Sequence, residues 1–244
     1  MHWSTEVTNG GVRQRRFDLD RGGRHVPGLL WTPEGARGPR PLVLIGHGAG
    51  GSKLEGYVVS LARRLVRHYA FAAAAIDGPV HGDRREDGGG DGTLAFLEFS
   101  QAWSLDPDMT DDMVADWRAT LDALQGLDDV GPGPVGWWGL SMGTIIGLPV
   151  VAAEPRITVA VLGLMGLTGP TRDRIAADAP AVTCPVLFLV QLEDELFARP
   201  PSLALFDALG SRDKRLHANP GRHAAVPPEE FGESERFLAR HLRS

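Results

Sequence analysis

Residues 139–143 of the sequence read Gly-Leu-Ser-Met-Gly and match the pattern G-x-S-x-G around Ser141. They follow an apolar run that predicts a strand and precede a pattern that predicts a helix, which is the context that this pattern requires. A sharp turn there would lift the Ser141 hydroxyl to the top of a sheet, beside the positive end of a helix. The pattern predicts a nucleophilic serine, and hence acyl transfer through a covalent intermediate.

A serine hydroxyl is a weak nucleophile, so this chemistry also requires an acid and then a base later in the chain. Three acids, Glu193, Asp194 and Glu195, come directly after the apolar run of residues 185–192. We select Asp194, the middle residue of the three, as the acid that orients the base. Glu193 and Glu195 are expected only to decorate the loop.

The base is expected among the histidines that follow Asp194. His217 lies within a pattern that predicts a strand, and His241 lies in the predicted terminal helix. His223 stands in a loop after the last predicted strand, where an imidazole can approach the serine. The sequence therefore predicts a triad of Ser141, His223 and Asp194, with His223 as the base.

Residues 46–51, with the sequence GHGAGG, allow three interpretations. They match the dinucleotide-binding pattern G-x-G-x-x-G, and Asp77 at the end of the next strand is a candidate ribose-binding acid. They also resemble a P-loop, except that Lys53 follows the serine instead of preceding it; Lys53 is expected to be solvated. Both nucleotide-binding interpretations leave Ser141 and its partners unexplained. We favour a loop whose backbone N–H groups, with that of Met142, bind the oxyanion of a tetrahedral intermediate.

Alternating strands and helices must position these residues. Short apolar runs bounded by proline or glycine predict buried strands, and apolar spacing near 3.6 residues predicts helices. Strands are predicted at 15–20, 25–33, 41–46, 71–76, 134–140, 158–165, 185–192 and 215–220, with a helix at 111–127 and others between and after the strands. The first two strands read as a hairpin. We therefore predict an α/β fold with a mostly parallel sheet and helices on both faces.

Two predicted helices contain residues that affect where a helix begins or ends. The first is expected to begin at Ser52, which would form a capping box with Glu55 and place Leu54 on the apolar face. The helix after Ser141 contains Pro149, which is expected to kink or shorten it.

The chain has 244 residues and a mass of 26.2 kDa, which suits a single α/β domain over residues 1–244. Its net charge of −6 lacks the electrostatic signature of nucleic-acid binding. With no signal sequence and no apolar run long enough for a membrane span, we expect a cytoplasmic protein without membrane contact. The single cysteine, Cys184, rules out an internal disulfide and a multi-cysteine metal site, and is expected in the core.

Residues 84–109 interrupt the alternation of strands and helices. The stretch 83–93 is charged and rich in glycine and is predicted to be mobile, whereas 94–105 is apolar enough to form a pocket wall or flap. Residues 167–182 are too few for a large lid, so any cover over the site must be small or come from 84–109.

The chain resembles the α/β-hydrolase family, in particular the compact bacterial esterases related to dienelactone hydrolase. The resemblance covers nearly the whole chain and rests on GHGAGG, DGPVHGD, GLSMG, LEDE and GRH, each after a predicted strand in the family's order. It implies an α/β-hydrolase fold with a small lid or none, an oxyanion N–H from Ala49 with Gly50 as the alternative, and a structural role for residues 77–83. Dienelactone hydrolases use a cysteine nucleophile, whereas this chain has Ser141.

The substrate pocket is expected to combine a few apolar side chains with one histidine. The candidate residues are His47, Trp103, Met165 and Leu167. Phe96 and Phe99 lie near Trp103 in the apolar segment, but the spacing of all three is more typical of plain packing.

These observations predict a serine hydrolase that cleaves a small-molecule carboxylic ester through an acyl-enzyme, without a metal or an organic cofactor. The same triad would also serve thioester cleavage, C–C bond hydrolysis, perhydrolysis or acyl transfer. A non-catalytic ligand-binding protein on the same fold is a second alternative. The oligomeric state and the acyl length stay open.

Overall fold

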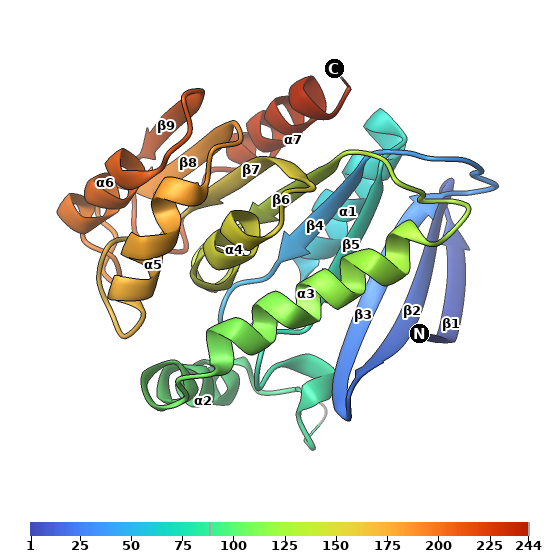
Figure 1. Cartoon of the computed structure of the whole chain (residues 1–244), viewed down its shortest axis with the longest axis horizontal. Coiled ribbons are helices and arrows are strands. Elements are labelled where there is room, and N and C mark those ends of the chain that lie inside the picture. Colours follow the sequence, from blue (N-terminus) through green and yellow to red (C-terminus); the bar gives the residue numbers. More distant parts are fainter. Residues whose placement is uncertain (88, 244) are drawn as a thin grey trace.

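A nine-stranded sheet runs through the part of the chain that the computed structural model describes, residues 1–87 and 89–243 (Figure 1). Its strands are β1 (His2–Asn9), β2 (Val12–Arg21), β3 (Arg24–Pro33), β4 (Leu42–Gly46), β5 (Ala72–Ile76), β6 (Val135–Gly139), β7 (Ile157–Gly163), β8 (Val186–Gln191) and β9 (Lys214–Asn219). They stand in the order β1-β2-β3-β5-β4-β6-β7-β8-β9. The first three strands and the β3–β5 pair are antiparallel, and the remaining pairs are parallel. The prediction of a mostly parallel sheet with an N-terminal hairpin is confirmed.

Helices cover both faces of this sheet. Within the described residues they are α1 (Gly56–Tyr69), α2 (Gly92–Leu105), α3 (Met109–Gln125), α4 (Met142–Ala153), α5 (Arg172–Asp178), α6 (Arg199–Ala208) and α7 (Pro228–Leu242), with short 3₁₀ turns at Gly82–Arg84 and Ala179–Ala181. α1 and α7 pack on one face, and α3 to α6 pack on the other (Figure 1). None of the helices in the described ranges is long and apolar enough to cross a membrane.

The central strands divide their side chains between two apolar cores. Leu42 and Leu44 of β4 belong to the core that includes α3 and α4, whereas Val43 and Ile45 belong to the core that includes α1 and α7. Every residue of β4 and β5 is buried. This is why these strands appear in the sequence as continuous apolar runs instead of alternating patterns.

Strand β1 at the N-terminus was not predicted from the sequence. Seven of its eight residues are exposed, so it lacks the apolar alternation that reveals a half-buried strand. It pairs with β2 along the sheet edge, from His2 opposite Asp18 to Asn9 opposite Val12. Backbone pairing with an existing edge strand needs no apolar pattern, and sequence periodicity therefore does not reveal it.

Helix α1 begins four residues later than predicted. Its N-cap is Glu55, which makes no capping hydrogen bond through its side chain, and Leu54 is 54% exposed. The Ser52 hydroxyl instead accepts a hydrogen bond from the N–H of Leu54, at 3.1 Å. The capping-box prediction is wrong because residues before Gly56 are held in the preceding loop by the burial of Lys53, described below.

Pro149 was expected to kink or shorten helix α4, but the helix does not end there and continues through the proline to Ala153. Proline removes one N–H donor from the helical ladder. Packing offsets this loss, since α4 is buried along almost its whole length between β6, β7 and α3.

Residues 84–109 contain helix α2, which begins after Asp91. The Asp91 carboxylate accepts hydrogen bonds from the N–H groups of Thr93 and Leu94 and thereby caps the helix. Gly88, in the stretch predicted to be mobile, lies outside the described residues. The pocket wall predicted for residues 94–105 is thus the helix α2.

Candidate active site

Ser141 stands at a sharp turn between the end of β6 and the start of α4. Its φ of 58° and ψ of −119° lie in a region that residues other than glycine rarely adopt. Its N–H donates to the carbonyl of Gly163 at 3.0 Å, which holds the turn against β7. Backbone strain of this kind persists where the surrounding structure enforces it, and it is concentrated at functional sites.

The glycines on either side of Ser141 are required by close backbone contacts. A Cβ at Gly139 would lie 2.5 Å from the carbonyl oxygen of Gly143, and a Cβ at Gly143 would lie 2.6 Å from that of Gly46. Both distances are shorter than a carbon atom tolerates, and in both the atom that would have to move belongs to the backbone. The predicted collision is therefore present, and it explains the spacing of the G-x-S-x-G pattern.

The fold brings together Ser141, His223 and Asp194, which lie in three separate parts of the sequence. His223 Nε2 is 2.9 Å from Ser141 Oγ, and His223 Nδ1 is 2.8 Å from Asp194 Oδ2. A carboxylate can only accept, so Nδ1–H donates to Asp194 and leaves the Nε2 lone pair for the serine hydroxyl. The other two histidines considered lie elsewhere: His217 pairs with Glu230, and His241 lies in α7.

Asp194 is fixed by the turn that follows β8. Its Oδ1 accepts hydrogen bonds from the N–H groups of Leu196 and Phe197, at 2.8 and 2.9 Å, and its side chain is only 2% exposed. Because three donors converge on one buried carboxylate, its orientation towards His223 is fixed.

Glu193 and Glu195, for which no role was predicted, form hydrogen bonds to the backbone near His223. The Glu193 carboxylate accepts a hydrogen bond from the N–H of Gly221, and that of Glu195 accepts one from the N–H of His223 at 2.9 Å. The hydrogen bond from His223 is the main cause that lowers the pKa of Glu195 to about 2. The two acids thus hold the backbone that carries the imidazole.

The glycine-rich loop leaves few backbone donors free. Gly48 N–H donates to the Tyr57 hydroxyl at 2.6 Å, and Gly50 N–H donates to His81 Nε2 at 3.0 Å. In the described part of the chain, the N–H groups of Ala49 and Met142 have no such partner. The geometry thus favours Ala49 over Gly50 as the loop donor, since the N–H of Gly50 is already engaged.

Neither a protein-family model nor a curated protein sequence matches this chain, whereas solved structures do. A cold-adapted esterase from an Arctic intertidal metagenomic library, solved in a PEG-bound complex, is 42% identical to it. The match covers 99% of this chain and 100% of that one, with a TM-score of 0.89. The chain belongs to the α/β-hydrolase family of esterases. The acetyl xylan esterase from Paenibacillus sp. R4 is 16% identical over 99% of this chain and 88% of its own, with a TM-score of 0.70, and shares the fold.

Two buried histidines of the esterase brace the glycine-rich loop against the loop after β5. His47 Nδ1–H donates to the Gly48 carbonyl at 2.9 Å, and its Nε2 accepts from Gly78 N–H at 2.8 Å. His81 Nδ1–H donates to the Pro79 carbonyl at 2.6 Å, while its Nε2 accepts from Gly50 N–H. Each loop therefore supplies an imidazole that accepts an N–H of the other.

Both of these imidazoles are neutral in the folded protein. Burial lowers the pKa of His47, and burial, with a smaller contribution from the neighbouring His47, lowers the pKa of His81 to about 4. A neutral ring is also what their hydrogen bonds require, because each Nε2 acts as an acceptor. The structural role predicted for residues 77–83 thus has a specific form, which is to hold the backbone of residues 48–50.

Lys53 is buried, contrary to the prediction that it would be solvated. Only 1% of it is exposed, and its Nζ lies 2.5 Å from Asp77 Oδ2 and also bonds Asp83. Asp77 Oδ1 in addition accepts the N–H of Lys53, so this acid is committed inside the protein and not offered to a ribose. The prediction failed because the two acids that pair with Lys53 are 24 and 30 residues away in the sequence. Only the fold places them beside the lysine.

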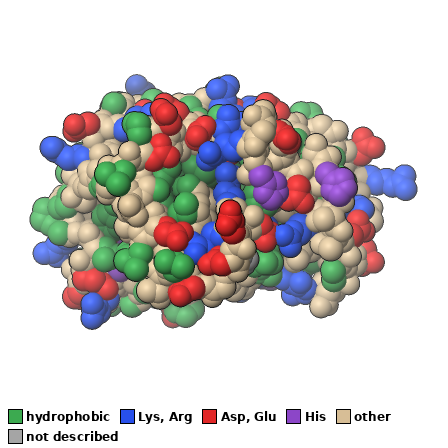
Figure 2. Space-filling view, turned by 90° about the horizontal axis from the view of Figure 1, so that it is seen from below, with side chains coloured by type: hydrophobic (Ala, Val, Ile, Leu, Met, Phe, Trp, Pro, Cys, Tyr) green, Lys and Arg blue, Asp and Glu red, His purple; other side chains and the backbone are tan. Residues whose placement is uncertain are grey.

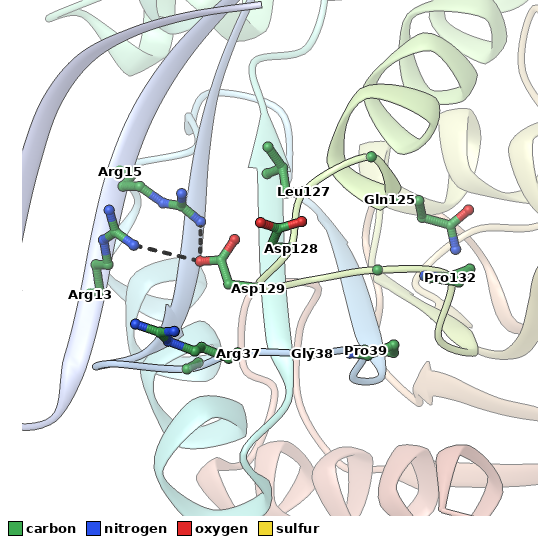
Figure 3. A pocket seen from close by; sticks show the side chains of 13 residues that line it. Arg13, Arg15, Arg37, Gly38, Pro39, Gln125, Leu127, Asp128, Asp129 and Pro132 are labelled. Carbon is green, nitrogen blue, oxygen red and sulfur yellow. Dashed lines mark hydrogen bonds and ion pairs between the residues drawn. The ribbon is translucent and has the colours of Figure 1, made fainter.

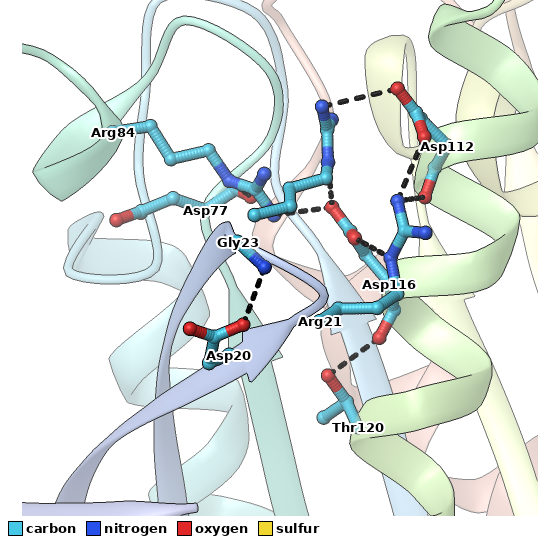
Figure 4. A network of polar contacts seen from close by, with 9 residues as sticks. Asp20, Arg21, Gly23, Asp77, Arg84, Asp112, Asp116 and Thr120 are labelled. Atoms are coloured by element: carbon cyan, nitrogen blue, oxygen red, sulfur yellow. Dashed lines mark hydrogen bonds and ion pairs between the residues drawn. The ribbon is translucent and has the colours of Figure 1, made fainter.

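A wider ionic network extends from Asp77, the partner of Lys53, to helix α3 and the N-terminal hairpin. Arg84 donates to the Asp77 carbonyl and to Asp116, and Arg21 and Arg24 of the N-terminal hairpin also pair with Asp116 (Figure 4). Asp116 is fully buried in α3. Paired charges of this kind tie the loop after β5 to the hairpin and to α3.

A cavity of about 210 Å³ opens beside Ser141 and is bounded by α2, α4 and the loop after β7. Trp103 lines it as predicted, and Phe96 and Phe99, expected only to pack, line it as well. His47, Met165 and Leu167 do not line it. His47 serves as the brace described above, Met165 is fully buried in the core, and Leu167 packs against that core, so these three pocket predictions are not supported.

The molecular face that carries α2 is hollowed and partly apolar. Figure 2 shows hydrophobic side chains gathered around a hollow on this face. The exposed apolar residues of α2 are Leu94, Phe96, Leu97 and Leu105.

No group of three His, Cys, Asp or Glu side chains in residues 1–87 and 89–243 is arranged to hold a metal ion.

Proposed function

We propose that this esterase hydrolyses a small-molecule carboxylic ester through an acyl-enzyme intermediate on Ser141. The observation that carries the proposal is the continuous hydrogen-bonded chain from Ser141 Oγ through the His223 ring to Asp194, which begins at a strained turn. A base oriented by an acid and placed on a serine hydroxyl is the arrangement that activates this nucleophile.

In the first half of the reaction, Ser141 Oγ attacks the acyl carbon and His223 Nε2 takes the hydroxyl proton. Asp194 stabilises the imidazolium that forms and keeps Nε2 directed at the serine. The negative charge develops on the former carbonyl oxygen, where the free N–H groups of Ala49 and Met142 would bind it. Such donors are worth about 10²–10³-fold each in rate, because they need no reorganisation as the charge appears.

Acylation is completed when His223 gives its proton to the alcohol oxygen and the bond between that oxygen and the acyl carbon breaks. The acyl group stays on Ser141 as an ester. In the second half, a water molecule attacks the acyl carbon while His223 accepts one of its protons, and His223 then gives that proton to Ser141 Oγ as the acid is released. Each half uses the same base and the same oxyanion donors.

Labelling with a fluorophosphonate, followed by peptide mapping, tests this function without knowledge of the natural ester. We expect the label on Ser141 alone, lost in Ser141→Ala and slowed by at least about 10³-fold in His223→Ala. Two controls should label at the wild-type rate: Ser104→Ala, at an exposed serine of α2 that does not line the cavity beside Ser141, and His217→Ala, at a histidine that pairs with Glu230 instead. Folded wild-type protein that takes no label, or labels equally without His223, would contradict the proposal.

A further inference from the structure

The cavity beside Ser141 is arranged to receive the acyl half of the ester, given the function proposed above. The alcohol oxygen must face His223 Nε2 in order to take its proton, so the acyl group extends away from that ring. The cavity is lined by Ser141, Met142 and Ala49, but His223 is not among its lining residues. A group that occupies it would therefore sit on the acyl side of the reacting carbon.

Helix α2 forms one long wall of this acyl cavity. Phe96, near its start, adjoins the oxyanion loop, since a Cβ at Gly50 would lie 3.7 Å from the Phe96 Cβ. Trp103 comes seven residues later, which places it roughly 10 Å further along the helix axis. The cavity thus extends along α2 from the oxyanion loop towards Trp103.

Trp103 lines the part of the cavity away from the oxyanion loop and is held there by its contacts. Its Nε1–H donates to Thr171 Oγ1 at 2.8 Å, and its ring stacks on Phe99 with centroids 6.1 Å apart and planes 13° apart. A Cβ on Gly169 would lie 2.5 Å from the Trp103 ring, so the ring rests directly on the backbone of the loop after β7. The indole therefore bridges α2 and this loop.

The size and chemistry of the cavity define the acyl group that it accepts. Its volume of about 210 Å³ lies below the roughly 300–1,000 Å³ of sites that enclose drug-sized ligands. None of the described residues that line it carries a charged side chain, and Ile145, Leu196 and Phe197 add to its apolar surface. A short, uncharged acyl group matches this space.

We propose that Trp103 determines the acyl-chain length of this esterase, and that the esters it prefers carry short, uncharged acyl groups. The indole acts as the end wall of the acyl cavity. Longer acyl chains meet the ring before their carbonyl carbon reaches Ser141.

The test is a series of p-nitrophenyl esters, from acetate through butyrate and hexanoate to octanoate, with kcat/KM measured for each. For wild type, we expect kcat/KM to fall steeply beyond butyrate. For Trp103→Ala, which removes the wall, we expect the ratio of octanoate to acetate kcat/KM to rise by at least about 10-fold, the scale of one or more methylene groups in an apolar pocket. Thr171→Val, which removes only the hydrogen bond, should raise the ratio by less.

Two further variants separate a pocket effect from a general effect on α2. Leu97→Ala changes a residue of the same helix that is 59% exposed, and it should leave the chain-length profile unchanged. Ser100→Leu adds bulk at a partly buried position that lines the cavity, and it should shift the profile the opposite way, towards acetate. The Ser100 variant tests the inference independently if Trp103→Ala folds poorly.

The outcomes distinguish this inference from the function on which it rests. If Trp103→Ala and Ser100→Leu both hydrolyse acetate with the wild-type chain-length profile, Trp103 does not set acyl length and the inference is overturned. An octanoate preference in wild type would overturn it equally. If folded wild-type protein hydrolyses none of these esters and takes no fluorophosphonate label, the proposed function itself fails, and the inference fails with it.

Discussion

Two of the cavities in the described part of the esterase lie at opposite ends of its parallel strands and differ in their polar groups. One, of about 210 Å³, lies beside Ser141 at the carboxyl ends of the parallel strands. The other, of about 810 Å³, is lined by residues 36–39 and 125–132, which precede β4 and β6, and therefore lies at the amino ends (Figure 3). The larger cavity carries more charge, but no serine, threonine, cysteine or histidine is among the described residues that line it.

In the larger cavity two of the arginines share one carboxylate. Arg15 lies 2.5 Å from Asp129 and also stacks on the Trp3 ring, while Arg13 lies 3.7 Å from the same carboxylate (Figure 3). Beside Ser141, in contrast, the N–H groups of Ala49 and Met142 have no partner in the described chain. Cavity volume alone thus does not indicate where the proposed reaction takes place, whereas a serine beside free backbone N–H donors supports the smaller cavity.

The strongest test of this comparison exchanges one aspartate in each region. Asp194→Asn should lower kcat by about 10⁴-fold, because an amide in place of the carboxylate favours the wrong tautomer of His223. Asp129→Asn should leave kcat unchanged but lower the free energy of unfolding by about 3–5 kcal/mol, since it leaves the mostly buried Arg15 without its counter-charge. Steady-state kinetics and urea unfolding of both variants decide the matter. A large kcat loss in the Asp129 variant would break the distinction between the two regions.

The free energy of unfolding, measured over a series of pH values, extends the comparison to His81, which holds the glycine-rich loop beside Ser141. In the unfolded chain His81 titrates near the ordinary histidine pKa of 6.5, whereas burial lowers the pKa of His81 in the folded protein to about 4. Between these pH values the unfolded chain binds a proton that the folded protein does not, so stability falls as the pH falls. The contribution of His81 is about 3 kcal/mol between pH 6.5 and pH 4.

The control for this acid sensitivity is His81→Gln, which supplies an acceptor oxygen and does not titrate. The free energy of unfolding of the variant should decline less than that of wild type over the same pH interval. Parallel pH profiles for the two proteins would mean that His81 is not the group responsible.

The smallest expected effect concerns the rate rather than the stability. His81→Ala removes the acceptor of the Gly50 N–H, and the adjoining Ala49 donor loses part of its fixed position. We expect kcat for p-nitrophenyl acetate to fall by about 10–100-fold, less than the 10²–10³-fold loss of a direct donor, with KM almost unchanged. His81→Gln should restore part of kcat. A rise in KM with kcat unchanged would show that His81 affects ester binding and not the oxyanion donors.

Much of the fold was predictable, because the buried strands and the G-x-S-x-G turn are local features. The apolar runs of β4 to β8 follow from burial on both faces, and the glycines around Ser141 follow from contacts within one turn. The order of residues in the chain also led to Asp194 and His223, whose side chains are in contact in the structure.

The errors share one cause, which is that the decisive partner is distant in sequence. Lys53 was expected in solvent because Asp77 and Asp83 could not be seen to approach it. His81 stood out only as part of the DGPVHGD turn, and nothing local showed that it would accept the Gly50 N–H. Strand β1 needs only the edge of β2, and no side-chain pattern records such pairing.

The sequence by itself determined the order of strands and helices, the strained serine turn and the candidate triad, since each depends on residue type and local spacing. Only the tertiary structure decided which backbone donors stay free, which charges are buried in pairs and where the acyl cavity ends. Those outcomes depend on contacts between loops that lie about 30 residues apart or more, such as His81 with Gly50 and Trp103 with Thr171. Hydrogen bonds are short-ranged and directional, so their pattern is set only when the chain has folded.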